Sequence, residues 1–282
     1  MSRLTPPGYG VSIQWMPRVP ERHMTSDDVG VARSSSGESV LTRAVRIFEA
    51  FSPDDPVLTV SQISRRAALP LATTIRLVDE LTRHGLLARD ERRRVRIGNR
   101  MWELAQRASP VRTLRETAMQ FMGDLHHVVG HSTQLGILDG DEVLFVERLV
   151  APGAVVNITK IGGRLPLHAS SAGLVLLATA CSEVKARVLR GPLTAFTPHT
   201  ITDPRTLRAT LADVSRHGLA FCPGHIHPDA TGIAVPVRAA GRVVAALGLV
   251  VPNDGNAWSL TRPLQLAGMA LSRALDVHAR TS

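Results

Sequence analysis

The chain has 282 residues, 44% of them hydrophobic and 20% charged, which is the composition of a folded globular protein long enough for two domains. It carries a formal net charge of +9, and nearly all of this positive charge is arginine, because Lys160 and Lys185 are the only lysines. Two cysteines make no disulfide framework, no apolar run could cross a bilayer, and the N-terminus lacks a signal-peptide core. We therefore expect a soluble, cytoplasmic protein without a membrane partner.

Residues 1–38 are rich in proline, glycine and serine and show no hydrophobic period, which predicts a disordered tail. Met24 stands just before the composition changes, and we hypothesise that translation starts there. The intact mass of the native protein would test that hypothesis.

Residues 39–98 predict three helices followed by a two-stranded hairpin. Apolar residues recur at helical spacing in the first helix, and we expect them to form its inner stripe: Leu41, Ala44, Val45 and Phe48. The second helix begins at a capping box, Thr59-Val-Ser-Gln62, and turns Ile63 and Ala67 inward. The third helix follows Leu69-Pro70, ends near Gly85, and has four inward residues: Thr74, Leu77, Val78 and Leu81.

The hairpin follows directly, since Val95 and Ile97 alternate with Arg94 and Arg96 beyond a turn at Asp90–Arg93. Three helices and a hairpin in this order are typical of a winged helix-turn-helix domain, whose third helix enters the major groove of DNA. Ser39–Arg100 carries 12 arginines against seven acidic residues, which favours phosphate contact by the hairpin. The alternatives are a solvated arginine face or a winged helix that binds only protein.

Arg76 could reach a guanine edge or a phosphate, Thr73 a phosphate, and Ala72 and Ile75 the thymine methyl groups. Asp79 and Glu80 should lie away from the phosphates. The predicted DNA-contacting residues are Thr59, Ser61, Ala72, Thr73, Ile75, Arg76, Arg92, Arg93 and Arg94.

Residues 99–110 predict a linker helix, and residues 111–282 a mixture of strands and helices without strict alternation. The expected elements are a helix over 111–130, strands over 132–138, 142–149 and 155–161, a loop at Gly162-Gly163 and Pro166, helices over 170–180 and from Asp203 to Gly218, strands over 230–237 and 242–251, and a last helix capped by Ser259. This order predicts an α+β domain with a mainly antiparallel sheet flanked by helices.

The chain resembles the IclR family of bacterial transcriptional regulators over residues 39–278. The resemblance is carried by Ser39–Ile47, Leu69-Pro70, Gly85-Leu86, Leu138–Val143, Gly163–Ser170, Ala172-Gly173, Thr200–Asp203 and Ile233–Val237. It implies a winged DNA-binding domain and a GAF-like effector-binding domain, assembled as a homodimer or homotetramer, with operator DNA and a small-molecule effector as partners. The family often has Lys-Ser after Leu-Pro, whereas Leu71 and Ala72 stand here, so its base preferences need not transfer.

The resemblance places the effector between the sheet and the loop that leads into the 170–180 helix, whose free N–H groups attract a carboxylate. Relatives that bind small oxo-acids commonly carry an acid, a cysteine and two serines on the facing strands, where this chain has Cys222, Gly232, Gly248 and Val250. We therefore expect a larger or more apolar effector than glyoxylate or pyruvate, such as an aromatic acid or a hydrophobic metabolite. The predicted effector-binding residues are Gly162, Gly163, His168, Ser170, Ser171, Ala172, Cys222, Thr231, Gly232, Ile233, Gly248 and Val250.

Two other classes of function stay open on the sequence. One short stretch carries three side chains of the kind that bind metals: Cys222, His225 and His227. Because no fourth ligand is obvious, we expect these side chains to line or cover the pocket. We expect no metal and no cofactor. The chain has no nucleophile elbow, phosphate loop or dinucleotide fingerprint, so we expect no enzyme. A DNA-binding protein without a sensing function would not explain the long second domain.

Overall fold

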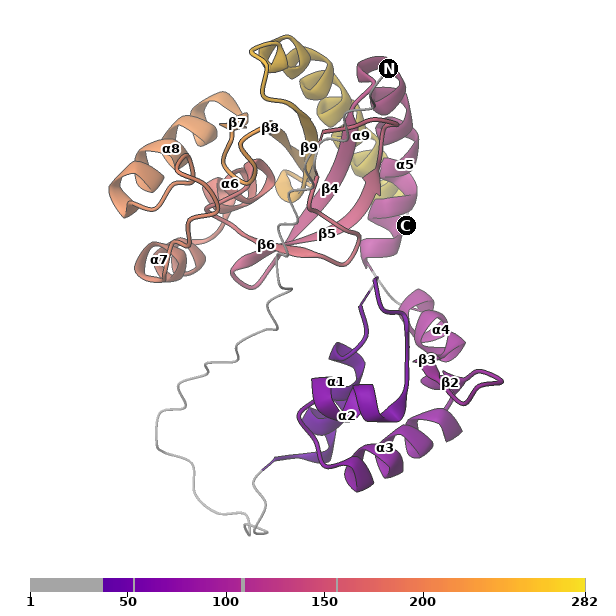
Figure 1. The fold of residues 1–282 in the computed structure, drawn as a ribbon. Helices are drawn as coiled ribbons and strands as arrows, with labels where there is room; N and C mark the ends of the chain where they lie inside the picture. The colour runs from indigo at the N-terminus through magenta and orange to yellow at the C-terminus, as the bar shows by residue number, and fades with distance from the viewer. Residues whose placement is uncertain (1–37, 53, 108–109, 156, 282) are drawn as a thin grey trace, which may run out of the picture. The chain divides into compact units, whose positions relative to one another are not determined.

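The computed structural model describes residues 38–52, 54–107, 110–155 and 157–281, and the chain divides into two units, Met1–Ala108 and Ser109–Ser282 (Figure 1). The tail predicted over residues 1–38 lies outside the described residues, apart from Glu38.

The first unit is a winged helix-turn-helix domain, as predicted. Its helices are α1 (Val40–Glu49), α2 (Val60–Arg66), α3 (Leu71–Arg83) and α4 (Asn99–Arg107). A small antiparallel sheet has the order β1-β3-β2, from β1 (Val57–Leu58), β2 (Leu87–Arg89) and β3 (Val95–Ile97). The hairpin was predicted, but β1 was not, because two residues are too few to show a strand period.

The core of this unit confirms the inner faces of α2 and α3 and corrects that of α1. Thr74, Leu77, Val78 and Leu81 are all buried. In α1, however, Leu41 and Val45 are 79% and 51% exposed, and Ile47 is the residue that is fully buried. The predicted stripe and the buried face differ because a short amphipathic helix can present apolar residues on more than one side.

The second unit is a six-stranded sheet in which every pairing is antiparallel, with the order β6-β5-β4-β9-β8-β7. The strands are β4 (Ser132–Asp139), β5 (Glu142–Leu149), β6 (Arg164–Pro166), β7 (Ala220–Pro223), β8 (Ala230–Ala239) and β9 (Arg242–Pro252). This confirms the predicted α+β class.

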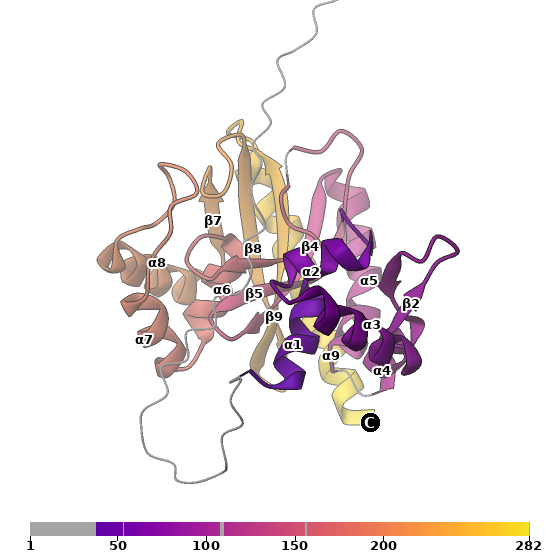
Figure 2. The same cartoon turned by 60° about the horizontal axis from the view of Figure 1, so that its bottom comes forward.

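Helices cover both faces of this sheet, as Figures 1 and 2 show. One face packs against α5 (Pro110–Val129) and α9 (Thr261–Thr281), through a core that includes Met122, Leu135, Ile233 and Leu264. The other face packs against α6 (Ser171–Thr179), which is itself covered by α7 (Ser182–Arg190) and α8 (Pro204–His217). Gly173 permits this packing, because a side chain there would collide with the backbone of Leu167.

Two predicted elements of the second unit are wrong, one helix was not predicted, and the boundary between the linker helix and the second unit differs. Residues 155 and 157–161 form no strand, and the third strand of the hairpin region is β6, within the predicted loop. α7 was not predicted at all. Ser259 does not cap the last helix: it lies in a 3₁₀ turn, Ala257–Leu260, and its hydroxyl donates to the carbonyl of Asn256. The linker helix α4 ends at Arg107, and α5 already begins at Pro110.

Candidate functional site

The outer face of α3 presents most of the side chains predicted to reach base edges. Ala72, Ile75 and Arg76 are exposed and Thr73 is half-buried, while the residues between them form the core. Pro70 occupies the N-cap position, so no side chain accepts a hydrogen bond from the first turn. The first turn therefore offers free backbone N–H groups beside these side chains, a combination suited to phosphate contact.

Both carboxylates on this face are neutralised by basic neighbours. Asp79 accepts a 2.7 Å hydrogen bond from Arg89 on β2. Glu80 contacts Arg83 at 2.7 Å and His84 at 3.1 Å. The hydrogen bond with His84 and the charge of Arg83 lower the pKa of Glu80. The expectation that these acids lie away from the phosphates stays a prediction.

The tip of the hairpin brings Arg92, Arg93 and Arg94 together on the surface. Asp90 shapes the turn, since its carbonyl accepts from Arg93 N at 2.9 Å and its carboxylate from Arg94 N at 2.8 Å. The same carboxylate also accepts from Arg94 Nε at 2.8 Å. Arg92 and Arg93 pair with no carboxylate of the described residues. Two of the three predicted wing arginines are therefore free to meet an external anion.

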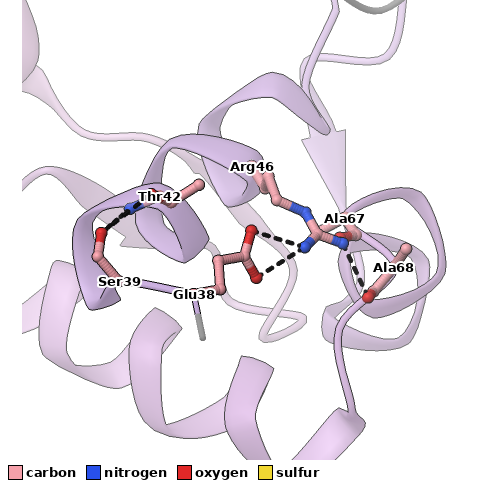
Figure 3. A network of polar contacts seen from close by, with 6 residues as sticks. All are labelled: Glu38, Ser39, Thr42, Arg46, Ala67 and Ala68. Atoms are coloured by element: carbon pink, nitrogen blue, oxygen red, sulfur yellow. Dashed lines mark hydrogen bonds and ion pairs between the residues drawn. The ribbon is translucent and has the colours of Figure 1, made fainter. Parts of the chain in front are cut away.

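The start of α2 and the turn before α3 are fixed by local contacts. Thr59 and Gln62 form the predicted capping box, in which Thr59 N donates to Gln62 Oε1 at 2.8 Å, and Ser61 is exposed. Arg46 of α1, which the sequence did not single out, donates to the carbonyls of Ala67 and Ala68 and to both carboxylate oxygens of Glu38 (Figure 3). This network holds the turn of the helix-turn-helix against the first helix.

A pocket with about 430 Å³ of unfilled space lies on the α6 face of the sheet in the second unit, and we call it the α6 pocket. Strand register explains its floor, because Cys222, Gly232 and Val250 stand side by side across β7, β8 and β9. Its lining residues are Gln134, Asn157, Ile158, Thr159, Leu165, Ala169, Ser170, Ser171, Cys222, His225, Ile226, His227, Ala230, Gly232 and Val250.

Five of the twelve predicted effector-binding residues line the α6 pocket: Ser170, Ser171, Cys222, Gly232 and Val250. The other seven do not line it. Ile233 packs into the core on the opposite face of the sheet, and Ala172 into the core beneath α6. Thr231 bonds Asn253, His168 contacts the carbonyl of Thr194, and Gly162 and Gly163 pair with the backbone of Phe145. Gly248 lies beside Gln134 on the sheet.

Gln134 and residues 157–159 were not predicted to line the effector site. A signal for Gln134 was present, since it is an isolated amide in the apolar strand from Ser132 to Leu138. Asn157, Ile158 and Thr159 were assigned to a strand. The expectation that Cys222, His225 and His227 line the pocket agrees with its geometry.

The N-terminus of α6 forms one end of the pocket. Ser170 Oγ accepts from Gly173 N at 3.1 Å, and the carbonyl of Ser170 accepts from Leu174 N at 2.9 Å. The backbone N–H groups of Ser171 and Ala172 have no hydrogen-bond acceptor among the described residues. Gly232 lies directly below, because a Cβ atom there would be 2.9 Å from Ser171 Oγ.

Burial controls the titratable groups of the pocket. Desolvation raises the pKa of the Cys222 thiol to about 12, so this sulfur stays protonated and is a poor nucleophile. Desolvation lowers the pKa of His225, and the charge of the nearby His199 lowers it further. Burial also lowers the pKa of His168. The imidazole Nδ1 of His225 is buried without a hydrogen-bond partner among the described residues.

Among the described residues, no three His, Cys, Asp or Glu side chains lie together as the ligands of one metal ion. Within the same ranges, no helix combines the length and apolar character needed to span a bilayer.

Two family models match the chain. The one described as the bacterial transcriptional regulator IclR C-terminal domain matches residues 106–256, and the IclR helix-turn-helix domain matches residues 40–91. The chain belongs to the IclR family. It is a transcriptional regulator with a DNA-binding helix-turn-helix domain and a C-terminal effector-binding domain.

Individual IclR-family proteins are similar over most of their length. The regulator XynR of Escherichia coli is 31% identical, covering 84% of this chain and 97% of its own. An IclR homolog from Microbacterium hydrocarbonoxydans, solved in complex with 4-hydroxybenzoate, is 44% identical with a TM-score of 0.82 and covers 86% of this chain and 100% of its own. The Pca regulon regulatory protein of Pseudomonas putida is 26% identical, covering 74% of this chain and 72% of its own.

Proposed function

We propose that this IclR-family regulator senses an aromatic carboxylic acid, which binds in the α6 pocket and changes the affinity of the protein for its operator DNA. One observation carries the proposal: the pocket joins a free helix N-terminus to apolar walls. The amides of Ser171 and Ala172 suit a carboxylate. Ile158, Leu165 and Val250 offer a surface for a ring. The 4-hydroxybenzoate bound to the Microbacterium homolog is a molecule of this class.

The proposal also explains why small oxo-acids should bind poorly. Gly232 and Val250 provide no polar side chain on the floor of the pocket, and Ile158, Leu165 and Ile226 add further apolar surface. A small acid would leave apolar walls in contact with trapped water, whereas an aromatic ring would displace it.

The DNA-binding part of the proposal assigns α3 to the major groove and the wing to the backbone. Ala72, Thr73, Ile75 and Arg76 would meet base edges and phosphates, with Arg92, Arg93 and Arg94 on the neighbouring phosphates or in the minor groove. Thr59 and Ser61, at the start of α2, would contact the phosphate backbone.

We propose that the protein acts as a homodimer or homotetramer in the cytoplasm. Two DNA-binding domains of such an assembly must match half-sites about one helical turn, or a multiple of it, apart. An effector that alters their spacing through the linker helix α4 would therefore change operator affinity. Either release or recruitment of DNA would satisfy this mechanism.

The test is operator binding by the purified full-length protein on the DNA upstream of its own gene, followed by fluorescence anisotropy. We expect 4-hydroxybenzoate to shift the operator dissociation constant by about fivefold or more, and glyoxylate to leave it unchanged. A response to glyoxylate and none to aromatic acids would contradict the proposal.

A further inference from the structure

The end of the α6 pocket away from the α6 N-terminus is a cluster of three polar side chains: Gln134 of β4 and, from the 157–159 segment, Asn157 and Thr159. Gln134 and Thr159 are only 3% and 6% exposed. Thr159 Oγ1 lies 2.8 Å from Gln134 Oε1 and 2.7 Å from Asn157 Oδ1. Thr159 N also donates to Asn157 Oδ1, at 3.1 Å. All three residues line the pocket.

The hydrogen-bonding capacity of this cluster is not satisfied internally. The Thr159 hydroxyl has one hydrogen, which it can donate to only one of the two amide oxygens beside it. Asn157 Oδ1 already accepts a hydrogen bond from a backbone N–H, so Gln134 Oε1 can accept a hydrogen bond from a further donor. Asn157 Nδ2, a donor, is buried without a partner among the described residues. Buried polar atoms in folded proteins are nearly always hydrogen-bonded, which indicates that a polar group of a bound ligand completes the hydrogen bonds of this cluster. A group that both donates and accepts one hydrogen bond would satisfy it, and a hydroxyl is such a group.

Arg148 fixes this cluster from the neighbouring strand. It stands opposite Gln134 in the β4–β5 register, on the same face of the sheet, and its Nη1 donates to the carbonyl of Thr159. Its Nε is buried without a partner, and it forms no ion pair with a carboxylate of the described residues. The segment that carries Asn157 and Thr159 is therefore tied to the sheet beside Gln134. The unpaired positive charge favours an electron-rich oxygen at this end.

The two ends of the pocket lie on different strands of the sheet. The α6 N-terminus lies over Gly232 of β8, and the Gln134 side chain extends from β4 over Gly248 of β9. A ring bound between them would direct polar groups at opposite ring positions toward the two ends.

We propose that Gln134, Asn157 and Thr159 form a subsite for a hydroxyl group at the ring position opposite the carboxylate. The subsite thereby selects para-hydroxylated aromatic acids over the unsubstituted acid. This inference rests on the proposed function, because it assumes that the carboxylate is held at the α6 N-terminus.

Isothermal titration calorimetry of the full-length protein with 4-hydroxybenzoate and with benzoate tests the subsite. The variants are Gln134→Met and Asn157→Leu, which keep side-chain volume but remove the hydrogen bonds. Thr133→Val is the matched control, since Thr133 adjoins Gln134 in β4 and its hydroxyl is also buried and unpartnered, but it lies on the opposite face of the sheet.

We expect the parent protein and Thr133→Val to prefer 4-hydroxybenzoate by about tenfold or more, and both pocket variants to lose this preference while still binding benzoate. A parent that binds both acids equally, or pocket variants that keep the preference, would overturn the subsite and leave the proposed function standing. A parent that binds neither acid would overturn both.

Discussion

Arg46 Nη2 donates to the carbonyl oxygen of Ala68 at 2.9 Å, and Ala68 has the left-handed backbone φ of +48° that turns the chain from α2 into α3 (Figure 3). Alanine seldom adopts this conformation, which is stable only when its surroundings hold it. The guanidinium of α1 therefore helps to set the orientation of the helix that carries Arg76.

Arg46→Met should weaken operator binding although Arg46 is not among the proposed DNA contacts. Loss of the hydrogen bonds to Ala67 and Ala68 leaves their carbonyls unsatisfied and should cost about 1–3 kcal/mol of stability in the first unit. Hydrogen exchange should show faster opening of α2 and α3, and anisotropy a weaker operator complex. Arg216→Met, which removes an exposed and paired arginine of the second unit, is the control. Unchanged exchange in α2 and α3 would contradict this role.

Asp79→Asn should strengthen DNA binding. The substitution removes a negative charge from the exposed face of α3 and releases Arg89 from its 2.7 Å ion pair, so the interface gains positive charge on both counts. Affinity for operator and for unrelated DNA should rise by about the same factor, since the gain is electrostatic. The isosteric Asp213→Asn, which breaks an exposed pair with Arg216 in the second unit, should have no effect. Weaker binding by Asp79→Asn would show that the pair with Arg89 serves to position α3.

Gly232→Ala should impair effector binding without unfolding the protein. The added Cβ would meet Ser171 Oγ at 2.9 Å, which forces the serine or the start of α6 to move at the proposed carboxylate end. Calorimetry should show a loss of about tenfold or more in affinity for 4-hydroxybenzoate. Gly123→Ala in α5 meets no atom within 4 Å and is the matched control. Full affinity in Gly232→Ala would place the carboxylate elsewhere.

Acid should destabilise the second unit through His225. Its pKa is lowered from 6.5 by burial and by His199, so the unfolded chain takes up a proton more readily than the folded one as the pH falls. The free energy of unfolding therefore decreases below about pH 6.5, and His168 adds to the same trend. Thermal midpoints between about pH 7.5 and 5.5 should fall less in His225→Gln than in the parent. The exposed His217→Gln should behave like the parent, and identical slopes in all three proteins would refute the assignment.

Local patterns were enough to predict much of the fold. The period of Thr74, Leu77 and Val78 identified the buried face of α3, and the capping box at Thr59 marked the start of α2. The hairpin β4–β5 follows from Asp139-Gly140, and Gly218, at φ +64°, ends α8 as expected. These features depend on neighbours in sequence, so the sequence alone carries the information.

Features that depend on distant contacts were missed. Only packing against α2 and α3 decides that Ile47, and not Leu41, is buried. The 157–159 segment contains Ile158 and Thr159, which are β-branched residues typical of a strand, but Asn157 Oδ1 accepts a hydrogen bond from the backbone N–H of Thr159, and Arg148 donates one to the carbonyl of Thr159. The Asn157 contact is local, but the contacts of Thr159 with Arg148 and Gln134 join different parts of the chain, and no local pattern encodes them.

The most direct test of the account is the salt dependence of operator binding by a variant in which Arg76, Arg92, Arg93 and Arg94 are all alanine. We predict that the parent protein binds its operator with an affinity that falls steeply as salt rises, and that the variant, still folded by circular dichroism, loses this association. A folded variant that binds the operator as tightly as the parent, with the same dependence on salt, would contradict the assignment of α3 and the wing to DNA.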